Sequence, residues 1–239
     1  IASSYPYQMV ARKFPTIWLK LKRENENSFE MLFDKYNPDE YAWVMTVKIW
    51  GLQAKHCHNT LSLHKAKEIS KEREIDNGRV AQAEYACYDM NEIDFLCFLD
   101  FYNFTHIELE NVYISHKEYL PKELVAIILK LFQQKTSLKG IESEYDNYMR
   151  SKNRINGVYG SSVFNFLNSG VYFDEESNYK YEKDEKSYND YIKYMKNPNQ
   201  YLWYSIGVWV TSYARRQILT PIKHMSENAI YCDTDSVKY

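Results

Sequence analysis

Two carboxylates lie two residues apart near the end of the sequence, in the segment Asp233-Thr234-Asp235-Ser236. On extended backbone, side chains at i and i+2 point to the same side. Both can then reach one hard cation, and Mg²⁺ prefers such oxygen ligands. Without a metal, the two anions would repel each other. An ordinary polar turn is the alternative, because Asp and Ser are common turn residues.

A second group of side chains, Lys152, Asn156 and Tyr159, recurs at helical spacing. Positions i, i+4 and i+7 share one helix face. A lysine, an amide and an aromatic ring along one stripe suit a triphosphate, a base edge and a stacked nucleotide. The charge of Lys152 would meet negative charge that develops on the phosphates. Gly157 lies beside the stripe and would allow a base pair to approach closely. A solvated helix face with a buried Tyr159 is the alternative.

The stripe lies in the second of two predicted helices, which span 121–138 and 141–159. Lys139-Gly140 separates them, with glycine where a helix end favours it. So short a connection requires the helices to pack antiparallel as a hairpin. From Lys130 to Arg154 there are six basic and three acidic residues, so this hairpin is locally positive.

The remaining pattern alternates between strands and helices. The segment 41–54 reads as one or two strands, 80–114 as short strands around a brief helix near 91–101, and 206–225 as a helix. Asp76-Asn77-Gly78 is a strong turn signal. Ala229 to Cys232 and Val237 are the arms of a β-hairpin with Asp233 and Asp235 at its tip. Ser3-Ser4-Tyr5-Pro6 reads as a turn that leads into a helix.

Composition sets broad limits. The chain has 239 residues and a net charge of -2, which argues mildly against a simple electrostatic DNA binder but leaves room for locally basic surfaces. No apolar run approaches the roughly 18 residues of a membrane helix, and no signal peptide is visible. We therefore expect a cytoplasmic protein with no membrane partner. The cysteines are expected to be free thiols: Cys57, Cys87, Cys97 and Cys232.

Three other features have ordinary explanations. A cluster of His56, Cys57, His58 and His64 suggests zinc, but its spacing matches no standard finger and it lacks a second pair. Four tryptophans could stack on bases, although aromatic residues of strands and helices are more often core: Trp43, Trp50, Trp203 and Trp209. The segment 174–196, with seven acids and five bases, is expected to be a solvated insertion.

Taken together, the three chemical segments resemble the family B DNA polymerases in order and separation. Residues 1–6 (IASSYP) resemble the first palm motif, whose pattern is Asp, two residues, Ser, one residue, Tyr-Pro. Residues 152–160 (KNRINGVYG) are similar to the fingers motif, and residues 231–236 (YCDTDS) match the third motif. The likeness spans the whole chain. It departs from the family at Gly157, usually Ser, and at Ser4, usually Leu. The family's first catalytic Asp would immediately precede Ile1.

Within that family the sequence is most similar to the protein-primed polymerases of small tailed phages and linear plasmids. The resemblance implies an α+β fold: a palm built from an antiparallel sheet with packed helices, a two-helix fingers hairpin and two insertions. The palm would comprise 1–120 and 161–239, with insertions at about 55–115 and 165–198, and the fingers would comprise 121–160. The exonuclease and the thumb would lie outside this excerpt. Because the family's first catalytic Asp, a metal ligand, would also lie outside it, the excerpt is expected to be inactive alone.

The implied activity is template-directed DNA synthesis, in which deoxynucleotides from dNTPs are transferred to a primer 3′-hydroxyl with two Mg²⁺ ions, Mn²⁺ being an alternative. The partners would be primer-template DNA, dNTPs and a terminal priming protein. The metals would be held between the aspartate expected before Ile1 and Asp235, with the carbonyl of Ile1 as a further ligand and Asp233 close by in a lesser role. Asp233 and Asp235 would be the catalytic residues of this chain. The dNTP would contact Ser3, Ser4, Tyr5, Lys135, Lys152, Asn156 and Tyr159. Template and primer would contact Gly160, Thr211, Arg215 and Thr234.

The ring of Tyr5 would leave no room for a ribose 2′-hydroxyl and would thus select deoxynucleotides. A non-catalytic module that grips primer-template DNA, or a fragment of a split polymerase, is the main alternative, and the residue before Ile1 would discriminate. An RNA-directed polymerase also ends a palm hairpin with paired aspartates. The stripe from Lys152 to Gly160 and the motif around Tyr5 argue against it.

Overall fold

The computed structural model describes residues 4–22, 28–163, 170–172, 180–182, 188–197, 204–233 and 236–239. Several residues with predicted roles lie outside this description, and those roles stay predictions: Ile1, Ser3, Thr234 and Asp235. Of Asp233 only the backbone is described. Trp203 and much of the predicted second insertion at 165–198 also lie outside the described residues.

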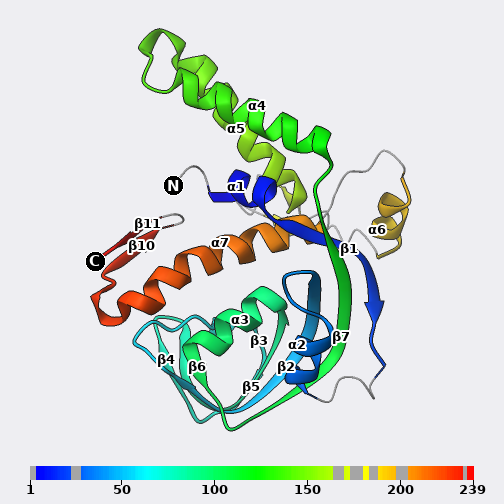
Figure 1. The fold of residues 1–239 in the computed structure, drawn as a ribbon, viewed down its shortest axis with the longest axis vertical. Coiled ribbons are helices and arrows are strands. Elements are labelled where there is room, and N and C mark those ends of the chain that lie inside the picture. The colour runs from blue at the N-terminus through cyan, green and yellow to red at the C-terminus, as the bar shows by residue number, and fades with distance from the viewer. Residues whose placement is uncertain are drawn as a thin grey trace.

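A curled antiparallel sheet of seven strands forms the base of the molecule (Figure 1). The strand order is β1-β7-β2-β5-β3, with β4 paired to β5 and β6 paired to β2. The strands are β1 (Lys13–Lys20), β2 (Tyr41–Ala54), β3 (Ala66–Ile69), β4 (Arg73–Asp76), β5 (Arg79–Asn91), β6 (Tyr102–Asn103) and β7 (His106–Tyr119). The prediction for β2 is confirmed, as is the mixed α and β fold class.

The strands on either side of β2 are longer than the sequence predicts. β5 has 13 residues and β7 has 14, where the pattern indicates short strands. Both pair with β2 along much of its 14-residue length. A long central strand supplies hydrogen-bond partners along most of each neighbour, so polar residues within β5 and β7 do not end the pairing.

The predicted turn at Asp76-Asn77-Gly78 is confirmed. Asn77 and Gly78 form a two-residue loop between β4 and β5, and both have positive φ, 46° and 73°. Two successive positive φ angles match the right-handed twist of a tight hairpin, which is why Asn-Gly is favoured there.

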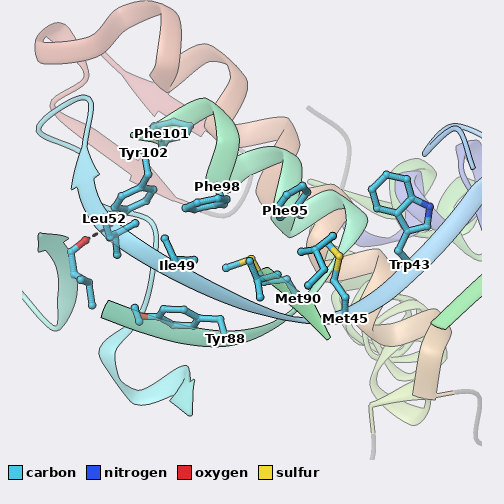
Figure 2. Packing of buried hydrophobic residues seen from close by; sticks show 14 of the residues in the cluster. Trp43, Met45, Ile49, Leu52, Tyr88, Met90, Phe95, Phe98, Phe101 and Tyr102 are labelled. Carbon is cyan, nitrogen blue, oxygen red and sulfur yellow. Dashed lines mark hydrogen bonds between the residues drawn. The ribbon is translucent and has the colours of Figure 1, made fainter. Parts of the chain in front are cut away.

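Helix α3 (Glu92–Phe101) packs on the sheet and forms the main core with it (Figure 2). Asn91 begins the helix, since its side chain accepts a hydrogen bond from the backbone N–H of Asp94. The aromatic face of α3 contributes Phe95, Phe98 and Phe101, and all three are at most 2% exposed. They lie with buried residues of β2 and β5, including Trp43, Met45, Ile49, Leu52, Tyr88 and Met90.

Helix α7 (Tyr204–Met225) crosses over α3, and α1 (Ser4–Ala11) packs on α7 in turn (Figure 1). Their shared apolar contacts form a second cluster that includes Met9 of α1, Phe14 of β1 and three residues of α7, Ile206, Trp209 and Val210. The predicted helix at 206–225 is confirmed. Of two shorter helices, α2 (Phe29–Lys35) packs against the main core, and α6 (Tyr188–Met195) lies between the described strand β9 and helix α7 in the chain.

Helices α4 (Lys122–Leu138) and α5 (Tyr145–Ser162) form the predicted antiparallel hairpin, which projects away from the sheet (Figure 1). Gly140 has a φ of 85° between them, as the helix-end prediction requires. A short 3-10 turn, η3 (Glu142–Glu144), delays the start of α5 by four residues relative to the prediction. Ile128 is the buried residue of α4, while α5 buries Ser151, Ile155 and Ser162.

The C-terminal segment forms the predicted β-hairpin, with β10 (Tyr231–Asp233) paired antiparallel to β11 (Ser236–Lys238). It follows α7 through the 3-10 turn η4 (Ser226–Asn228). A second two-stranded unit pairs β8 (Gly170–Tyr172) with β9 (Lys180–Glu182). Within the described parts of the chain, no helix is both long and apolar enough to cross a membrane.

The tryptophans, cysteines and histidines that the sequence singles out have ordinary structural surroundings. Trp43 and Trp209 are core residues, at most 2% exposed, and Trp50 is half-buried. All four cysteines are free thiols. His58 forms a hydrogen bond to the carbonyl of Ser226, and His56 packs edge-on against Phe101. Across the described ranges, no three His, Cys, Asp or Glu residues gather as a metal site.

Candidate functional site

Two residues that the sequence places 154 positions apart meet between α1 and α5. The rings of Tyr5 and Tyr159 stack with centroids 4.4 Å apart and planes inclined by 27°. Tyr5 lies in the first turn of α1 beside the buried Ser4, and Tyr159 lies in the last turn of α5. Burial raises the pKa of Tyr159, and the nearby Tyr5 acts in the same direction. The segment around Tyr5 and the stripe on α5 therefore meet in space.

The predicted stripe on α5 lies beside the buried face of this helix. The buried side of α5 is formed by Ser151, Ile155 and Ser162. Lys152 and Asn156 each follow a buried residue by one position, and Tyr159 lies one turn before Ser162. Lys152 and Tyr159 are half-buried as a result, whereas Asn156 is exposed. The tyrosine anchors one end of the stripe, and the amide and ammonium groups remain open to a ligand.

The glycines beside the stripe leave open space. A Cβ atom built on Gly157 or Gly160 would meet no heavy atom of the described residues within 4 Å. Both residues are exposed. This face of α5 can thus be approached closely at two successive turns, as the sequence predicts for Gly157.

Lys135 lies in the last turn of α4, on the helix that packs against α5. Its ammonium lies 5.8 Å from the ring centroid of Phe132. Lys135 is half-buried, as is Lys152. The two helices of the hairpin therefore each carry one of the predicted triphosphate-binding lysines.

Helix α7 carries the predicted template contacts one turn apart. The hydroxyl of Thr211 donates to backbone carbonyls of its own helix, at 2.7 Å to Val208 and 3.2 Å to Gly207. Arg215 lies close enough to Tyr159 to oppose the upward shift of the tyrosine pKa. Its Nη1 forms an ion pair with Asp94 of α3.

The partners of Arg215 were not predicted from the sequence. Asp94 accepts from Arg215 with one carboxylate oxygen and from the hydroxyl of Ser212 at 3.2 Å with the other. Asn91 donates to the same hydroxyl at 2.8 Å while it caps α3. Asn is a preferred residue at the start of a helix, so the cap could have been predicted. Nothing in the sequence predicts that α7 lies opposite this cap.

A buried ion pair supports α7 from below. Lys117 of β7 lies 3.2 Å from Glu92, and both side chains are at most 3% exposed. Glu92 also accepts hydrogen bonds from Trp209 Nε1 at 2.8 Å and from the backbone N–H of Trp43 at 3.0 Å. Burial raises the pKa of Glu92, while Lys117 and these donors act in the opposite direction. The pair fixes α7 and α3 to the sheet because each charge depends on the other for compensation.

The hairpin β10–β11 has the backbone of Asp233 opposite Ser236, and residues 234 and 235 between the two strands lie outside the described residues. Both α1 and β11 contact α7, and Figure 1 shows the hairpin and the start of α1 towards the same end of the molecule. The chemistry of Asp233 and Asp235, two carboxylates two residues apart in the sequence, fits a hard cation such as Mg²⁺.

The comparisons with known proteins point to one fold. Neither a scan against protein-family models nor a search of curated proteins finds a match. Among solved structures, phi29 DNA polymerase complexed with primer-template DNA superposes with a TM-score of 0.70 at 18% identity, covering 99% of this chain and 36% of that one. Its ternary complex with primer-template DNA and incoming nucleotide substrates gives a TM-score of 0.68 with 99% of this chain covered. The chain spans little more than a third of phi29 DNA polymerase and has the fold of that part of it.

Proposed function

We propose that this chain is the palm and fingers of a template-directed DNA polymerase of the protein-primed family B type, which adds deoxynucleotides from dNTPs to a primer 3′-hydroxyl. The observation that carries the proposal is the stack of Tyr5 on Tyr159 at 4.4 Å. It joins the first and second polymerase-like segments at the base of the helical hairpin, in a fold that covers 99% of the chain in the superposition on phi29 DNA polymerase.

In this proposal the hairpin α4–α5 is the fingers and binds the nucleotide. Lys152 and Lys135 neutralise the triphosphate, and their charges act most strongly where the closed site excludes water. Asn156, next to the open space at Gly157, contacts the nascent base pair together with Tyr159. Tyr5 lies under the sugar and excludes a 2′-hydroxyl, and Ser3 and Ser4 contribute polar groups beside it. Thr211, Arg215, Gly160 and Thr234 contact template and primer.

Two Mg²⁺ ions would be held by Asp233, Asp235 and the carbonyl of Ile1, and when bound they would stabilise the attacking and leaving oxygens. Mn²⁺ could replace them. The described part of the chain contributes position: β10 and β11 flank the segment that holds the two aspartates, and α7 contacts both β11 and α5 at the base of the fingers. A terminal protein that supplies the priming hydroxyl, and a cytoplasmic location, belong to the same proposal.

Primer extension tests the proposal directly. In the protein at its full natural length, Asp235→Asn should abolish extension of a labelled DNA primer and leave primer-template affinity within about threefold, since one carboxylate of the metal set is lost while the DNA contacts remain. Glu227→Gln in η4, which also removes one carboxylate, is the matched control and should extend normally. Normal extension by Asp235→Asn would overturn the assigned site. DNA binding without extension by the wild type would favour a non-catalytic module.

Sugar selection supplies a second test. Tyr5→Val should raise the relative incorporation of ribonucleotides by roughly tenfold or more, because a smaller side chain admits the 2′-hydroxyl. Tyr7→Val is the control, since Tyr7 lies on the same helix with 46% of its surface exposed. Unchanged selectivity in Tyr5→Val would remove Tyr5 from that role.

A further inference from the structure

A small niche lies where the loop before η2 (Leu63–Lys65), strand β5 and helices α3 and α7 meet. Its volume is about 70 Å³, and three cations line it, Lys65, Arg79 and Arg215. Two carboxylates, Asp89 and Asp94, line it as well. The space exceeds the roughly 30 Å³ that one water molecule takes up in the liquid. It can therefore hold a small polar group.

The carboxylates of the niche are already paired, while two of its cations are not. Asp89 accepts from Thr46 at 2.7 Å and from Lys67 at 3.1 Å. Asp94 accepts from Arg215 and Ser212. By contrast, the ammonium of Lys65 has no acceptor among the described residues. The guanidinium of Arg79 donates to the carbonyl of Thr60 at 3.1 Å and to no acid of the described chain. The niche therefore has surplus positive charge.

The wall that carries Lys65 and Arg79 is held in place. The hydroxyl of Tyr102 accepts from the backbone N–H groups of Thr60 and Leu61, at 2.9 and 3.0 Å, and donates to the carbonyl of Val80 at 2.8 Å. The N–H of Val80 donates in turn to the carbonyl of Leu61 at 2.9 Å. A ligand would meet a pre-formed wall, so little ordering is required on binding.

The niche also has an unmet hydrogen-bonding group. Tyr88 lines it and is 3% exposed, yet its hydroxyl has no hydrogen-bond partner among the residues that the structure describes. Buried polar groups in folded proteins are nearly always paired with protein or with ordered water. An anion in the niche, directly or through a water beneath it, would supply the missing acceptor.

We propose that this niche binds a backbone phosphate of the DNA template strand, with Lys65 and Arg79 as its ligands, beside the contacts of Thr211 and Arg215. The inference rests on the proposed polymerase function. Arg215 belongs to both sites, and Thr211 lies one turn before it on α7, a rise of about 6 Å. The niche extends this row of contacts from α7 towards the sheet. It assigns to the predicted first insertion, 55–115, a specific contact with the template.

Salt-dependent DNA binding tests this assignment in the protein at its full natural length. Each phosphate contact contributes a slope of about 0.9 to log affinity against log salt. Because one phosphate contributes about 0.9 in total, Arg79→Ala and Lys65→Ala should each lower the slope for a primer-template duplex by up to about 0.9, and the double variant by no more than that. Binding should weaken by up to roughly eightfold at about 0.1 M salt, with no dependence on base sequence. Arg73→Ala and Lys71→Ala are matched controls, since they remove the same charges from exposed positions outside the niche.

The outcomes separate this proposal from the one on which it rests. Wild-type protein that extends primers, with Arg79→Ala and Lys65→Ala no different from their controls in slope, would overturn the niche and leave the polymerase intact. Wild-type protein that neither binds primer-template DNA nor extends it would overturn both. A loss of slope confined to the two niche variants supports the phosphate site. Circular dichroism of each variant would show that the fold persists.

Discussion

The sheet with α3 and the helical hairpin α4–α5 differ in how firmly each is held. Helix α3 buries six of its ten residues, whereas the 17-residue α4 buries Ile128. Large apolar side chains of the hairpin region face solvent, among them Ile127 at 53% and Tyr145 at 61% exposure. One region is fixed by interlocking aromatic contacts, and the other is a pair of helices attached at its base.

This difference indicates which region can move at a lower cost in free energy. Close-packed cores resist displacement, while elements with few buried contacts open at lower free energy. The Tyr5–Tyr159 stack lies at the boundary, with one ring from α1, which packs on α7, and the other from the hairpin. A site built across such a boundary can be opened and closed by the weaker region while the stronger one stays in place.

The largest effect should come from the core. Phe98→Ala removes a fully buried ring of α3 and should lower the free energy of unfolding by about 3–5 kcal/mol. Ile127→Ala, on the exposed side of α4, should change it by no more than about 0.5 kcal/mol. Urea denaturation followed by circular dichroism measures both. Similar losses from the two variants would show that the hairpin is as tightly integrated as the sheet.

Ile155 tests whether the hairpin unfolds as a unit of its own. It is 1% exposed on α5, so Ile155→Ala should cost about 2–5 kcal/mol locally. We expect amide protons of α4 and α5 to exchange faster, while those of β2 and β5 keep their protection. Hydrogen exchange read by mass spectrometry resolves the two regions. An equal loss of protection in the strands would contradict the contrast between them.

The same contrast explains what the sequence could predict. The helical hairpin was predicted from local signals, because apolar spacing and a glycine at its end define each helix without reference to the rest of the chain. The lengths of β5 and β7 cannot be predicted from local signals, because they depend on pairing with β2, which is a long-range property. The local pattern of short apolar runs underestimated both strands.

The candidate site divides in a similar way. Lys152, Asn156 and Tyr159 are one stripe on any helix, so their shared face followed from spacing. Their meeting with Tyr5 came only from family resemblance, because no local rule joins residues 154 positions apart. The ion pairs of Asp94 and Glu92 were not predicted for the same reason. In the sequence each is an ordinary acid in the first turn of a helix, and its partner belongs to a distant element, α7 for Asp94 and β7 for Glu92.

Gly207 controls how closely the hairpin approaches α7. A Cβ atom at this position would overlap the side chain of Val163 and lie 2.8 Å from Ser162 Oγ and 3.1 Å from the carbonyl oxygen of Ser162. Gly207→Ala should therefore displace the end of α5 and cost about 1–3 kcal/mol. Gly157→Ala, where a Cβ meets open space, is the control and should stabilise the helix by about 0.5–1 kcal/mol.

Partial rescue would locate the strain at Gly207. Val163→Ala in the Gly207→Ala background removes the overlapping methyl groups and should recover part of the loss, while the carbonyl contact remains. Thermal denaturation of the two single variants and the double variant gives the comparison. No recovery would place the cause elsewhere than in the approach of α5 to α7.

The smallest effect concerns the Tyr5–Tyr159 stack itself, and it tests the boundary most directly. An offset aromatic pair contributes about 0.5–1.5 kcal/mol beyond the area it buries. A double-mutant cycle of Tyr5→Leu and Tyr159→Leu should return a coupling energy in that range. The cycle of Tyr7→Leu with Tyr159→Leu should return none, since Tyr7 makes no ring contact with the described residues. A Tyr5–Tyr159 coupling near zero would mean that this ring contact does not stabilise the boundary, and the hairpin would then be held by its apolar contacts, such as those of Ile155 and Ile128, and by its close approach to Gly207.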